Sequence, residues 1–559
     1  MPDPSRLRRL VAALGLLLAA ILLLRTVVDV VAATSSEWLW DDAYMYVRYA
    51  DHFLSGFGVR WNPREPPTYG LTSLLFLAPV TILRAFTPAS DGAAVLAASL
   101  GSGVILLALL GVLAWRLAVD APGRGVALLP VAFAVLWRPG LERHFSTGMD
   151  TTFAMAALTG FLLAAIQLFR APTRRGAVWI GLAGGALYVA RPDLMLFPAG
   201  VLAAAVLGAR DRASRGHALA AAAACAAVLV AELIAARVYF GTAVPLPFYA
   251  KGTALYGSAM RASYATTAGE QLAEFVRLHW PLLALAASPL AGGLRRLRAT
   301  WRPLELGVLA ATLAYGAYFR FLVLQVMPYS QRFYQPTLPP LVFLAARAAV
   351  EWLRAPPSLF TTRRAAWLAG VATPLLLLAL FDAAEYGWAS VEQLGVRVAA
   401  ARSGANGPSS DGGAAEEAAT DANEATWRSA IFLARELPDL PDDLVLAGTD
   451  IGYIAARARR KRVVDLAALH DTDFALHGFS ADRLLRVDRP DLLFLPHKDY
   501  AEMRAAIRGH PVFLAEYDLF TKQRVRGLGF ALRRTSPHYP ELVKLAEPWL
   551  LDPPKPSGH

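Results

Sequence analysis

The sequence predicts a polytopic α-helical membrane protein that carries a soluble α/β domain at its C-terminal end. Of the 559 residues, 56% are hydrophobic and only 18% are charged, whereas an average soluble domain has about 25% charged residues. Apolar runs of roughly 15–24 residues, long enough to cross a bilayer as helices, recur from residue 10 to residue 381. Beyond residue 381 no further apolar span follows, which predicts a soluble domain there.

About eleven transmembrane helices are expected in residues 1–381. The apolar run 71–86 lies between two candidate spans, and we interpret it as a membrane-surface or re-entrant segment. The N-terminal segment also resembles a signal peptide, but a retained signal-anchor helix is the favoured interpretation. The expected helices lie near 10–33, 92–115, 126–137, 151–168, 177–190, 194–208, 217–236, 278–292, 304–322, 336–350 and 365–381.

The arginines indicate which side of the membrane each loop faces. With the N-terminus inside, every expected inner loop is rich in arginine, which is the pattern of the positive-inside rule. The net charge of +11 is therefore a topology signal and does not indicate a nucleic-acid partner. The arginine clusters lie at 6–9, 116–124, 170–175, 210–215, 295–302 and 354–364.

The loops that carry polar, motif-like sequence all fall on the opposite, outer face in this topology. We therefore expect a multi-pass protein of the bacterial inner membrane, with its chemistry and its C-terminal domain on the periplasmic or extracellular side. These outer loops are 34–91, 138–150, the bend at 190–193, 237–277 and 323–335.

Residues 382–559 are predicted to form the outer α/β domain, with a low-complexity and disordered segment at 403–426. Within the domain, "DLVLAGT", "KRVVDLA" and "RPDLLFLP" predict strands, "DIGYIAARAR" predicts a helix and "RVRGLGFALRR" predicts a hairpin. Asp450 and Asp465 stand at strand ends, where carboxylates often bind ligands. We favour simpler roles for them, Asp450 as a helix N-cap and Asp465 as a surface acid.

Two adjacent acids, Asp41 and Asp42, follow the first apolar span in the stretch "SSEWLWDDAYMYVRYADHFLSGFGVRWNPREPPTYGLTS". From Ala43 onwards the apolar residues recur at helical spacing, and Gly56 is a natural stop. This pattern predicts an amphipathic helix along the outer membrane surface, with Asp41 as its N-cap and Asp42 in its first turn. The N-cap role accounts for Asp41, but it does not explain why a second acid, Asp42, follows it directly.

A series of short motifs accompanies this acid pair along the outer face. They are "DDAYMYVRYADHFLSGFGVRWNP" with "YGLTS", "STGMDTTFAMAAL", "ARPD", "FGTAVPLPFYAKG", "RFYQPTLP", and "TDIGYIA" with "RVVDLAALHD". Together they span almost the whole chain. In this order they resemble the GT-C type integral-membrane glycosyltransferases, which use sugars carried on polyprenyl phosphate. The terminal β-(1→2)-arabinofuranosyltransferase group of actinobacterial cell-wall synthesis is the most similar. Asp150 and Asp193 depart from that group's glutamates.

The resemblance implies an inverting glycosyltransferase that moves a sugar, such as the pentose arabinofuranose, to a cell-envelope glycan or glycolipid. Asp41 would be the general base for the acceptor hydroxyl, and Asp42 would orient the acceptor or join a metal site. Cations would hold the departing phosphate, and aromatic rings would stack on sugars. The cation candidates are Lys251, Arg332, Arg191 and His144, and the aromatic candidates are Tyr249, Tyr334 and Trp61.

Each of these candidates also has a structural alternative. Arg191 has a neighbouring acid, Asp193, with which it can pair. Aromatic residues at the outer interface often form a belt that anchors the protein in the bilayer. Lone cations often extend along apolar surface toward water.

Cofactor signals are sparse. Mg²⁺, Mn²⁺ or Ca²⁺ could bind the oxygens of Asp41 and Asp42. No cluster of cysteine and histidine suggests zinc, no glycine-rich nucleotide motif occurs, and the single cysteine, Cys225, rules out an intramolecular disulfide. The alternative functions are a transporter or flippase for a lipid-linked sugar, and a ligand-binding sensor with an outer domain. A transporter would be expected to show internal repeats, which we do not find.

Overall fold

The protein is described by a computed structural model in which side chains and backbone are placed for most of the chain. The described residues are 39–88, 91–118, 131, 134, 141, 144–252, 258–289, 302–325, 329–354, 436–496, 500–520 and 529–550. The predicted helices 10–33 and 365–381, most of 126–137, the segment 403–426 and the domain boundary at 381/382 lie outside these residues.

Two compact units divide the chain. The first unit contains Ser99–Leu229 and the described residues from Ala265 to Arg354. The second unit contains Leu39–Ala98, Val230–Tyr264 and the described residues from Glu436 onwards. Segments far apart in the sequence therefore fold together within each unit.

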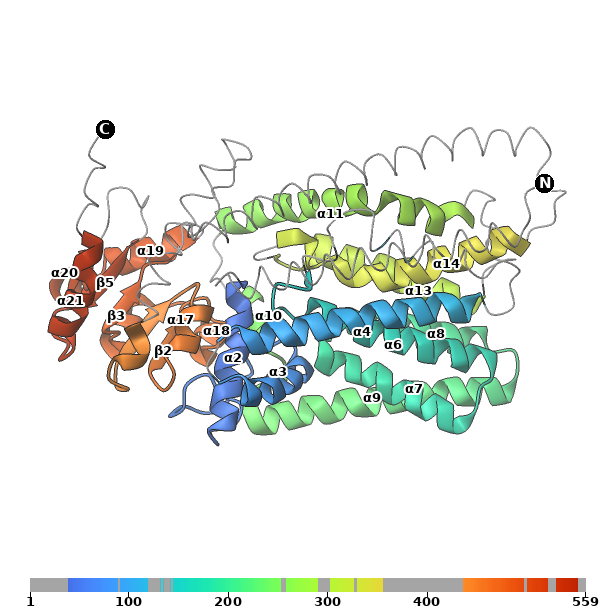
Figure 1. Cartoon of the computed structure of the whole chain (residues 1–559), viewed down its shortest axis with the longest axis horizontal. Helices are drawn as coiled ribbons and strands as arrows, with labels where there is room; N and C mark the ends of the chain where they lie inside the picture. The colour runs from blue at the N-terminus through green and yellow to red at the C-terminus, as the bar shows by residue number, and fades with distance from the viewer. Residues whose placement is uncertain are drawn as a thin grey trace, which may run out of the picture. The chain divides into compact units, whose positions relative to one another are not determined.

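The first unit is helical, and its helices run lengthwise beside one another in Figure 1. Three of its helices, α4, α9 and α11, extend by some residues into the second unit. The helices are α4 (Ala93–Leu117), α6 (Thr151–Arg170), α7 (Arg174–Ala190), α8 (Leu196–Gly208), α9 (Arg212–Phe240), α11 (Ser258–Ala287), α13 (Pro303–Ala317) and α14 (Leu338–Arg354), with short turns η3 (Pro192–Met195), η5 (Tyr318–Leu322), η6 (Tyr329–Gln331) and η7 (Gln335–Thr337).

Small residues let these helices approach one another closely. A Cβ added to Gly200 of α8 would lie 2.9 Å from the carbonyl oxygen of Gly307 on α13, and a Cβ on Gly307 would lie 2.9 Å from that of Gly200. Only glycine at both positions allows this contact, which is typical of helix pairs in membranes. Gly185 of α7 packs in the same way against Val228 of α9.

Several predicted spans correspond to helices of this unit, but the total of eleven is not confirmed. Among the described residues, three helices are long and apolar enough to cross a membrane: Ala93–Leu117, Thr151–Arg170 and Arg212–Phe240. The segment 237–277, expected as an outer loop, contains the helix α10 and most of α11. Helix α11 begins at Ser258, well before the predicted start at 278, because its first half is rich in good helix formers yet too polar to register as a membrane span.

The second unit contains a five-stranded sheet of order β2-β1-β3-β5-β4. Strands β1 and β2 pair in parallel, as do β1 and β3, whereas β5 runs antiparallel to both β3 and β4. The strands are β1 (Val445–Gly448), β2 (Arg462–Asp465), β3 (Leu492–Phe494), β4 (Tyr517–Phe520) and β5 (Phe530–Arg533). The three strands predicted before residue 500 are confirmed. The predicted hairpin is partly wrong, since the partner of β5 is β4 and lies upstream of it.

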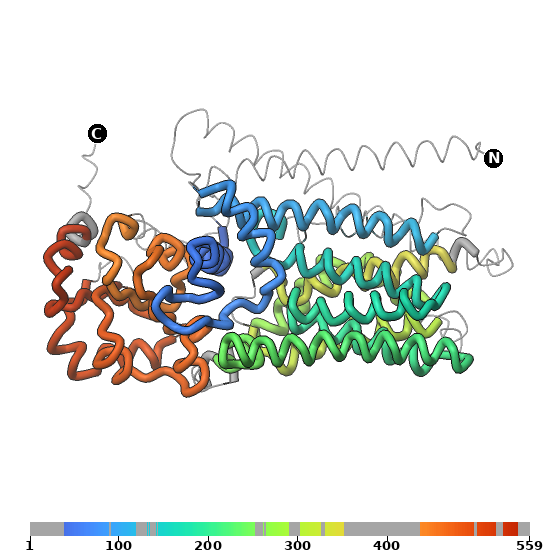
Figure 2. The backbone as a smooth tube through the Cα atoms, turned by 90° about the horizontal axis from the view of Figure 1, so that it is seen from below, coloured from blue at the N-terminus to red at the C-terminus, as the bar shows by residue number. Residues whose placement is uncertain are grey.

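Helices surround this sheet and complete the second unit. Figure 2 shows the segment from residue 39 to residue 98, drawn in blue, beside the C-terminal residues drawn in orange. These helices are α2 (Asp41–Leu54), α3 (Leu74–Phe86), α10 (Leu246–Gly252), α17 (Gly452–Arg457), α18 (Thr472–His477), α19 (Ala501–Arg508), α20 (Pro511–Glu516) and α21 (Tyr539–Leu550), with the turns η9 (Leu437–Asp439) and η10 (Arg483–Asp488).

Helix α2 is buried on both faces, which corrects the expectation of a helix lying on the membrane surface. It packs against α3 and α17, and its polar residues Arg48 and His52 are as buried as its apolar ones. Only the last turn is open, where Phe53 and Leu54 are about half exposed. The predicted stop is confirmed, because Gly56 has a φ of 81°, a conformation that glycine adopts without strain.

Candidate active site

The carboxylate of Asp41 is held by the first turn of helix α17. One oxygen, Oδ2, accepts a hydrogen bond from the backbone N–H of Gly452 at 2.7 Å, and Oδ1 accepts one from Tyr453 at 2.7 Å. The side chain does not cap its own helix, whose N-cap is Trp40. The predicted N-cap role is therefore wrong, because Asp41 is itself helical and its side chain reaches a different helix, 411 residues away in sequence.

Burial changes the acidity of this carboxyl. Asp41 is 7% exposed, and burial raises its pKa from 3.8 to about 7. The two backbone N–H groups oppose that rise, and the charges of Asp42 and Asp450 add to it. A carboxyl with a pKa near neutrality is half ionised at neutral pH, and it is therefore suited to accept a proton. Asp42 stands next to it in the first turn, partly buried.

Helix α17 fits closely against Asp41 because residue 452 is glycine. A Cβ at this position would overlap the backbone carbonyl oxygen of Asp41 and would lie 3.0 Å from its Cγ. The helix has no cap of its own: its N-cap is Ile451, without a side-chain bond, so the predicted capping role of Asp450 is also wrong. Asp41 accepts the first N–H groups of α17, which is the capping role that was expected of Asp450.

The buried guanidinium of Arg48 ties α2 to the C-terminal part of the unit. It donates to the carbonyl oxygens of Trp61, Ala455, Arg459 and Lys461 at 2.6–3.1 Å, and to Oδ1 of Asn62 at 3.0 Å. Arg48 is 1% exposed. Its hydrogen bonds to backbone carbonyls explain why a residue predicted for the polar face of an amphipathic helix lies in the interior.

Trp61 packs inside the fold, which corrects the sugar-stacking role suggested for it. It is 1% exposed, and its ring stacks on His470 at 4.0 Å between centroids. Its Nε1–H donates to the carbonyl oxygen of Val463 at 2.9 Å. The hydroxyl of Tyr49 lies 3.1 Å from Nδ1 of the same histidine, so the three rings form one buried cluster.

Asp465 is fully buried and is not the surface acid that we expected. Its oxygens accept backbone N–H bonds from Ala467, Leu469 and His470 at 2.8–2.9 Å. Burial raises its pKa from 3.8 to about 8, although the three backbone N–H groups act to lower it. The carboxylate thus shapes the loop that presents His470, a role that its position at a strand end did not reveal.

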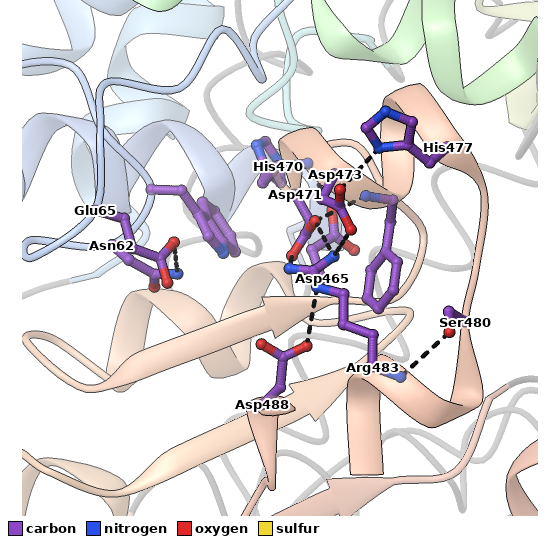
Figure 3. Close-up of polar contacts among 12 residues, drawn as sticks. Asn62, Glu65, Asp465, His470, Asp471, Asp473, His477, Ser480, Arg483 and Asp488 are labelled. Atoms are coloured by element: carbon purple, nitrogen blue, oxygen red, sulfur yellow. Dashed lines mark hydrogen bonds and ion pairs between the residues drawn. The ribbon is translucent and has the colours of Figure 1, made fainter. Parts of the chain in front are cut away.

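A group of charged residues that sequence analysis missed lies beside this loop (Figure 3). Arg483 binds Asp471 through two hydrogen bonds of 2.8 and 2.9 Å and also pairs with Asp473 and Asp488. Arg462 pairs with Glu65 at 2.6 Å and Asp488 at 2.7 Å. These ion pairs join strand β2, the turn η10 and the loop after α2. No local signal pointed to them, because their partners come from separate segments.

Two candidate substrate ligands lie on helix α10 of the same unit. Tyr249 and Lys251 are both partly buried, and α10 contacts α18. The helix is anchored at its start, where the N–H of Leu246 donates to the carbonyl oxygen of Tyr69 at 2.8 Å. The acid pair and Lys251 therefore belong to one unit.

The other candidates belong to the first unit. Arg191 donates to both oxygens of Asp193 at 3.1 and 2.8 Å, which is the pairing that its structural alternative predicted. The hydroxyl of Tyr315 donates to the same Asp193 at 2.6 Å. Burial raises the pKa of Asp150, and the charges of Arg191 and Arg332 oppose that rise.

His144 and Tyr334 are buried in the first unit. Nε2 of His144 lies 2.9 Å from the carbonyl oxygen of Ser330. The hydroxyl of Tyr334 donates to the carbonyl oxygen of Ala268 at 3.0 Å, and the ring is 1% exposed. The ring of Tyr334 thus packs in the core of the unit, which does not fit the sugar-stacking role suggested for it.

The described residues contain no group of three or more histidine, cysteine, aspartate or glutamate side chains that could hold a metal ion. Asp42 stands beside Asp41, but both oxygens of Asp41 already accept a backbone N–H. The acid pair therefore offers a cation fewer free oxygens than its sequence suggests.

Solved structures provide the comparison for the fold. No known family profile matches the chain, and no curated protein matches it in sequence. ArnT from Cupriavidus metallidurans in the apo state is similar over 93% of this chain and 98% of its own, with a TM-score of 0.54 and 16% identity. The same protein bound to undecaprenyl phosphate covers the same shares, with a TM-score of 0.52 and 14% identity.

A third similar structure is the Archaeoglobus fulgidus oligosaccharyltransferase in complex with zinc and sulfate. It is similar over 91% of this chain and 72% of its own, with a TM-score of 0.50 and 12% identity. These proteins are GT-C glycosyltransferases, so the GT-C fold expected from the sequence is confirmed. The resemblance to the arabinofuranosyltransferase group is not confirmed by these matches.

Proposed function

We propose, from the GT-C fold, that this protein is an inverting glycosyltransferase which transfers a sugar from a polyprenyl-phosphate donor to a glycan or glycolipid of the cell envelope. The shared fold with ArnT, which has been solved bound to undecaprenyl phosphate, supports this class of donor. Arabinofuranose as the sugar is supported by the sequence motifs alone. The arginine-rich inner loops support a bacterial inner-membrane protein whose active site faces outward.

The buried carboxylate of Asp41 carries this proposal. In the reaction, the acceptor hydroxyl oxygen attacks the anomeric carbon while the bond from that carbon to the phosphate oxygen breaks. The bonding electrons leave with the phosphate, and the hydroxyl proton passes to Asp41. Each carboxylate oxygen can accept a second hydrogen bond beside its backbone N–H, so the acceptor hydroxyl still has a partner. Attack from the face opposite the phosphate inverts the anomeric carbon.

The departing phosphate gains charge, and a cation must stabilise it. We assign this role to Lys251, on α10 of the same unit as Asp41. Arg332 stays our second proposed phosphate ligand, because a guanidinium can donate two parallel hydrogen bonds to two oxygens of one phosphate. Arg191 and His144 are weaker choices, since Arg191 already binds Asp193 and His144 lies against a backbone carbonyl. Tyr249, partly buried on α10, stays the aromatic candidate for a sugar contact.

The proposal also includes a divalent cation, with the carboxylate of Asp42 as one of its ligands. Mg²⁺ is commonly held by one or two carboxylates together with substrate phosphates, and Asp42 supplies a carboxylate in the first turn of α2, next to Asp41. Treatment with EDTA tests this role. A loss of turnover that Mg²⁺, Mn²⁺ or Ca²⁺ restores supports it, and unchanged turnover removes the cation from the proposal.

The donor class is tested with purified protein and two kinds of sugar donor. We expect turnover of a polyprenyl-phosphate sugar and none of UDP- or GDP-sugars, because the described residues and the sequence contain no loop that grips a diphosphate. Turnover of a nucleotide sugar without lipid would contradict the donor class. Movement of the lipid-linked sugar across proteoliposomes without product would favour the transporter alternative.

The base is tested with Asp41→Asn. We expect turnover to fall by about 10²–10⁴-fold, the usual contribution of a general base, while donor binding persists. The pH dependence of kcat/KM in the unsubstituted protein is the second measurement. Since burial raises the pKa of Asp41 to about 7, the ionised base is lost as the pH falls through 7. The acid limb of the profile should therefore lie near pH 7 and not near pH 4.

A further inference from the structure

The contact between Asp41 and helix α17 joins two parts of the chain that sequence analysis treated separately. Asp41 follows the first predicted span, whereas Gly452 and Tyr453 belong to the C-terminal segment after strand β1. Both oxygens of the carboxylate are engaged, each by one backbone N–H at 2.7 Å. Two bonds to two oxygens fix the plane of the carboxylate as well as its position.

Other contacts hold α17 in place against α2. The ring of Tyr453 packs edge-on against Tyr44, with 4.8 Å between centroids. The guanidinium of Arg48 donates to the carbonyl oxygen of Ala455 at 2.6 Å, and Arg457 pairs with Asp91 at 2.7 Å. Helix α17 therefore contacts α2 and its neighbours along its whole length, and the glycine at 452 leaves no space for it to shift closer.

We infer that the first turn of α17, through the backbone N–H groups of Gly452 and Tyr453, is a positioning element that orients the base Asp41 toward the acceptor hydroxyl. This inference rests on the proposed function. Neither residue touches the reacting atoms, and both act through the carboxylate of Asp41. The C-terminal domain would then contribute to catalysis through the two hydrogen bonds that Gly452 and Tyr453 donate to Asp41.

The orientation of the carboxylate matters for proton transfer. A base must lie within hydrogen-bond reach of the proton that it accepts, and a displacement of about 1 Å can lower the rate about 10²-fold.

A pair of variants at residue 453 isolates the hydrogen bond. Tyr453→Pro removes the N–H and the ring, whereas Tyr453→Ala removes the ring alone. Proline is tolerated in the first turn of a helix, where the N–H makes no bond within the helix. We expect kcat to fall by about 10²-fold in Tyr453→Pro while KM is unchanged, and both constants to stay the same in Tyr453→Ala. Equal kcat values in the two variants would overturn the inference.

A second variant keeps the test decisive if the proline protein does not fold. Gly452→Ala should push α17 away from Asp41 and also lower kcat, with Gly160→Ala as the control, because a Cβ at Gly160 meets nothing within 4 Å. A folded Gly452→Ala protein with unchanged kcat overturns the inference. Asp41→Asn separates the two levels: near-normal turnover there refutes the base itself, whereas a large loss there with unchanged kcat in the variants at 452 and 453 refutes only the positioning role.

Discussion

Single residues in the second unit show how buried polar groups find hydrogen-bond partners. The guanidinium of Arg48 is buried, and its donors are satisfied by four carbonyl oxygens and the amide oxygen of Asn62. Burial lowers its pKa to about 9, so it stays charged at neutral pH. Asp41 and Asp465 follow the same rule with backbone N–H donors. Each of these side chains joins backbone segments that would otherwise leave polar groups unpaired.

Adding one methyl group at Gly70 should destabilise the packed cluster around His470. A Cβ on Gly70 would overlap Nδ1 of His470 and lie 2.5 Å from the hydroxyl oxygen of Tyr49. Gly70→Ala should therefore lower the free energy of unfolding by about 1–3 kcal/mol, the usual cost of overpacking a core. Thermal unfolding in detergent measures this, with Gly160→Ala as the control. Equal stability of the two alanine variants would contradict the packing shown here.

At the scale of elements, ion pairs join helices that the sequence pattern treats as independent. Arg84, near the end of α3, binds both oxygens of Asp51 on α2, at 2.7 and 3.0 Å, and approaches Asp91 at 3.3 Å. Asp91 in turn binds Arg457 of α17. The arginine side chain is 8% exposed. Three helices are thereby tied through two carboxylates.

Removing the central arginine should loosen this assembly. Arg84→Met removes the bidentate partner of Asp51 and one of the two arginine partners of Asp91, and we expect a loss of about 1.5–3 kcal/mol in stability, the range for hydrogen bonds to charged groups. Arg486 supplies the control, because its pair with Asp482 is largely exposed and such pairs contribute at most about 1 kcal/mol. If chemical unfolding shows the same midpoint for Arg84→Met and Arg486→Met, the proposed tie between the helices is wrong.

At the scale of the whole molecule, the segments that form the two units alternate along the sequence. The second unit collects residues from three separate stretches, Leu39–Ala98, Val230–Tyr264 and the described residues from Glu436 onwards. Its sheet is contiguous in sequence, but the helices that cover it are not. The acid pair, Lys251 and α17 thus belong to one unit, although Asp41 and Gly452 are 411 residues apart.

The predicted sidedness can be measured with single cysteines. In a Cys225→Ala background, Glu502→Cys places a thiol on the exposed side of α19, and Arg210→Cys places one in an exposed position of a predicted inner loop. A membrane-impermeant maleimide should label position 502 in intact spheroplasts and position 210 only after lysis, because arginine-rich loops stay inside. Labelling of position 210 alone in intact cells would reverse the topology.

Features that depend on neighbours along the chain could be predicted from the amino-acid sequence. Hydropathy predicted the membrane helices α4, α6 and α9, the strands β1, β2 and β3 followed from apolar runs, and Gly56 ended α2 as expected. The motifs, read in order, indicated the GT-C fold. The contacts of Asp41, Trp61 and Asp465 could not be predicted in this way, because their partners are backbone groups or rings that folding brings together. A periodic pattern reports which face of a helix is apolar, but it contains no information on what will cover the polar face. For that reason the sequence singled out Asp41, and the fold placed Gly452 and Tyr453 against it.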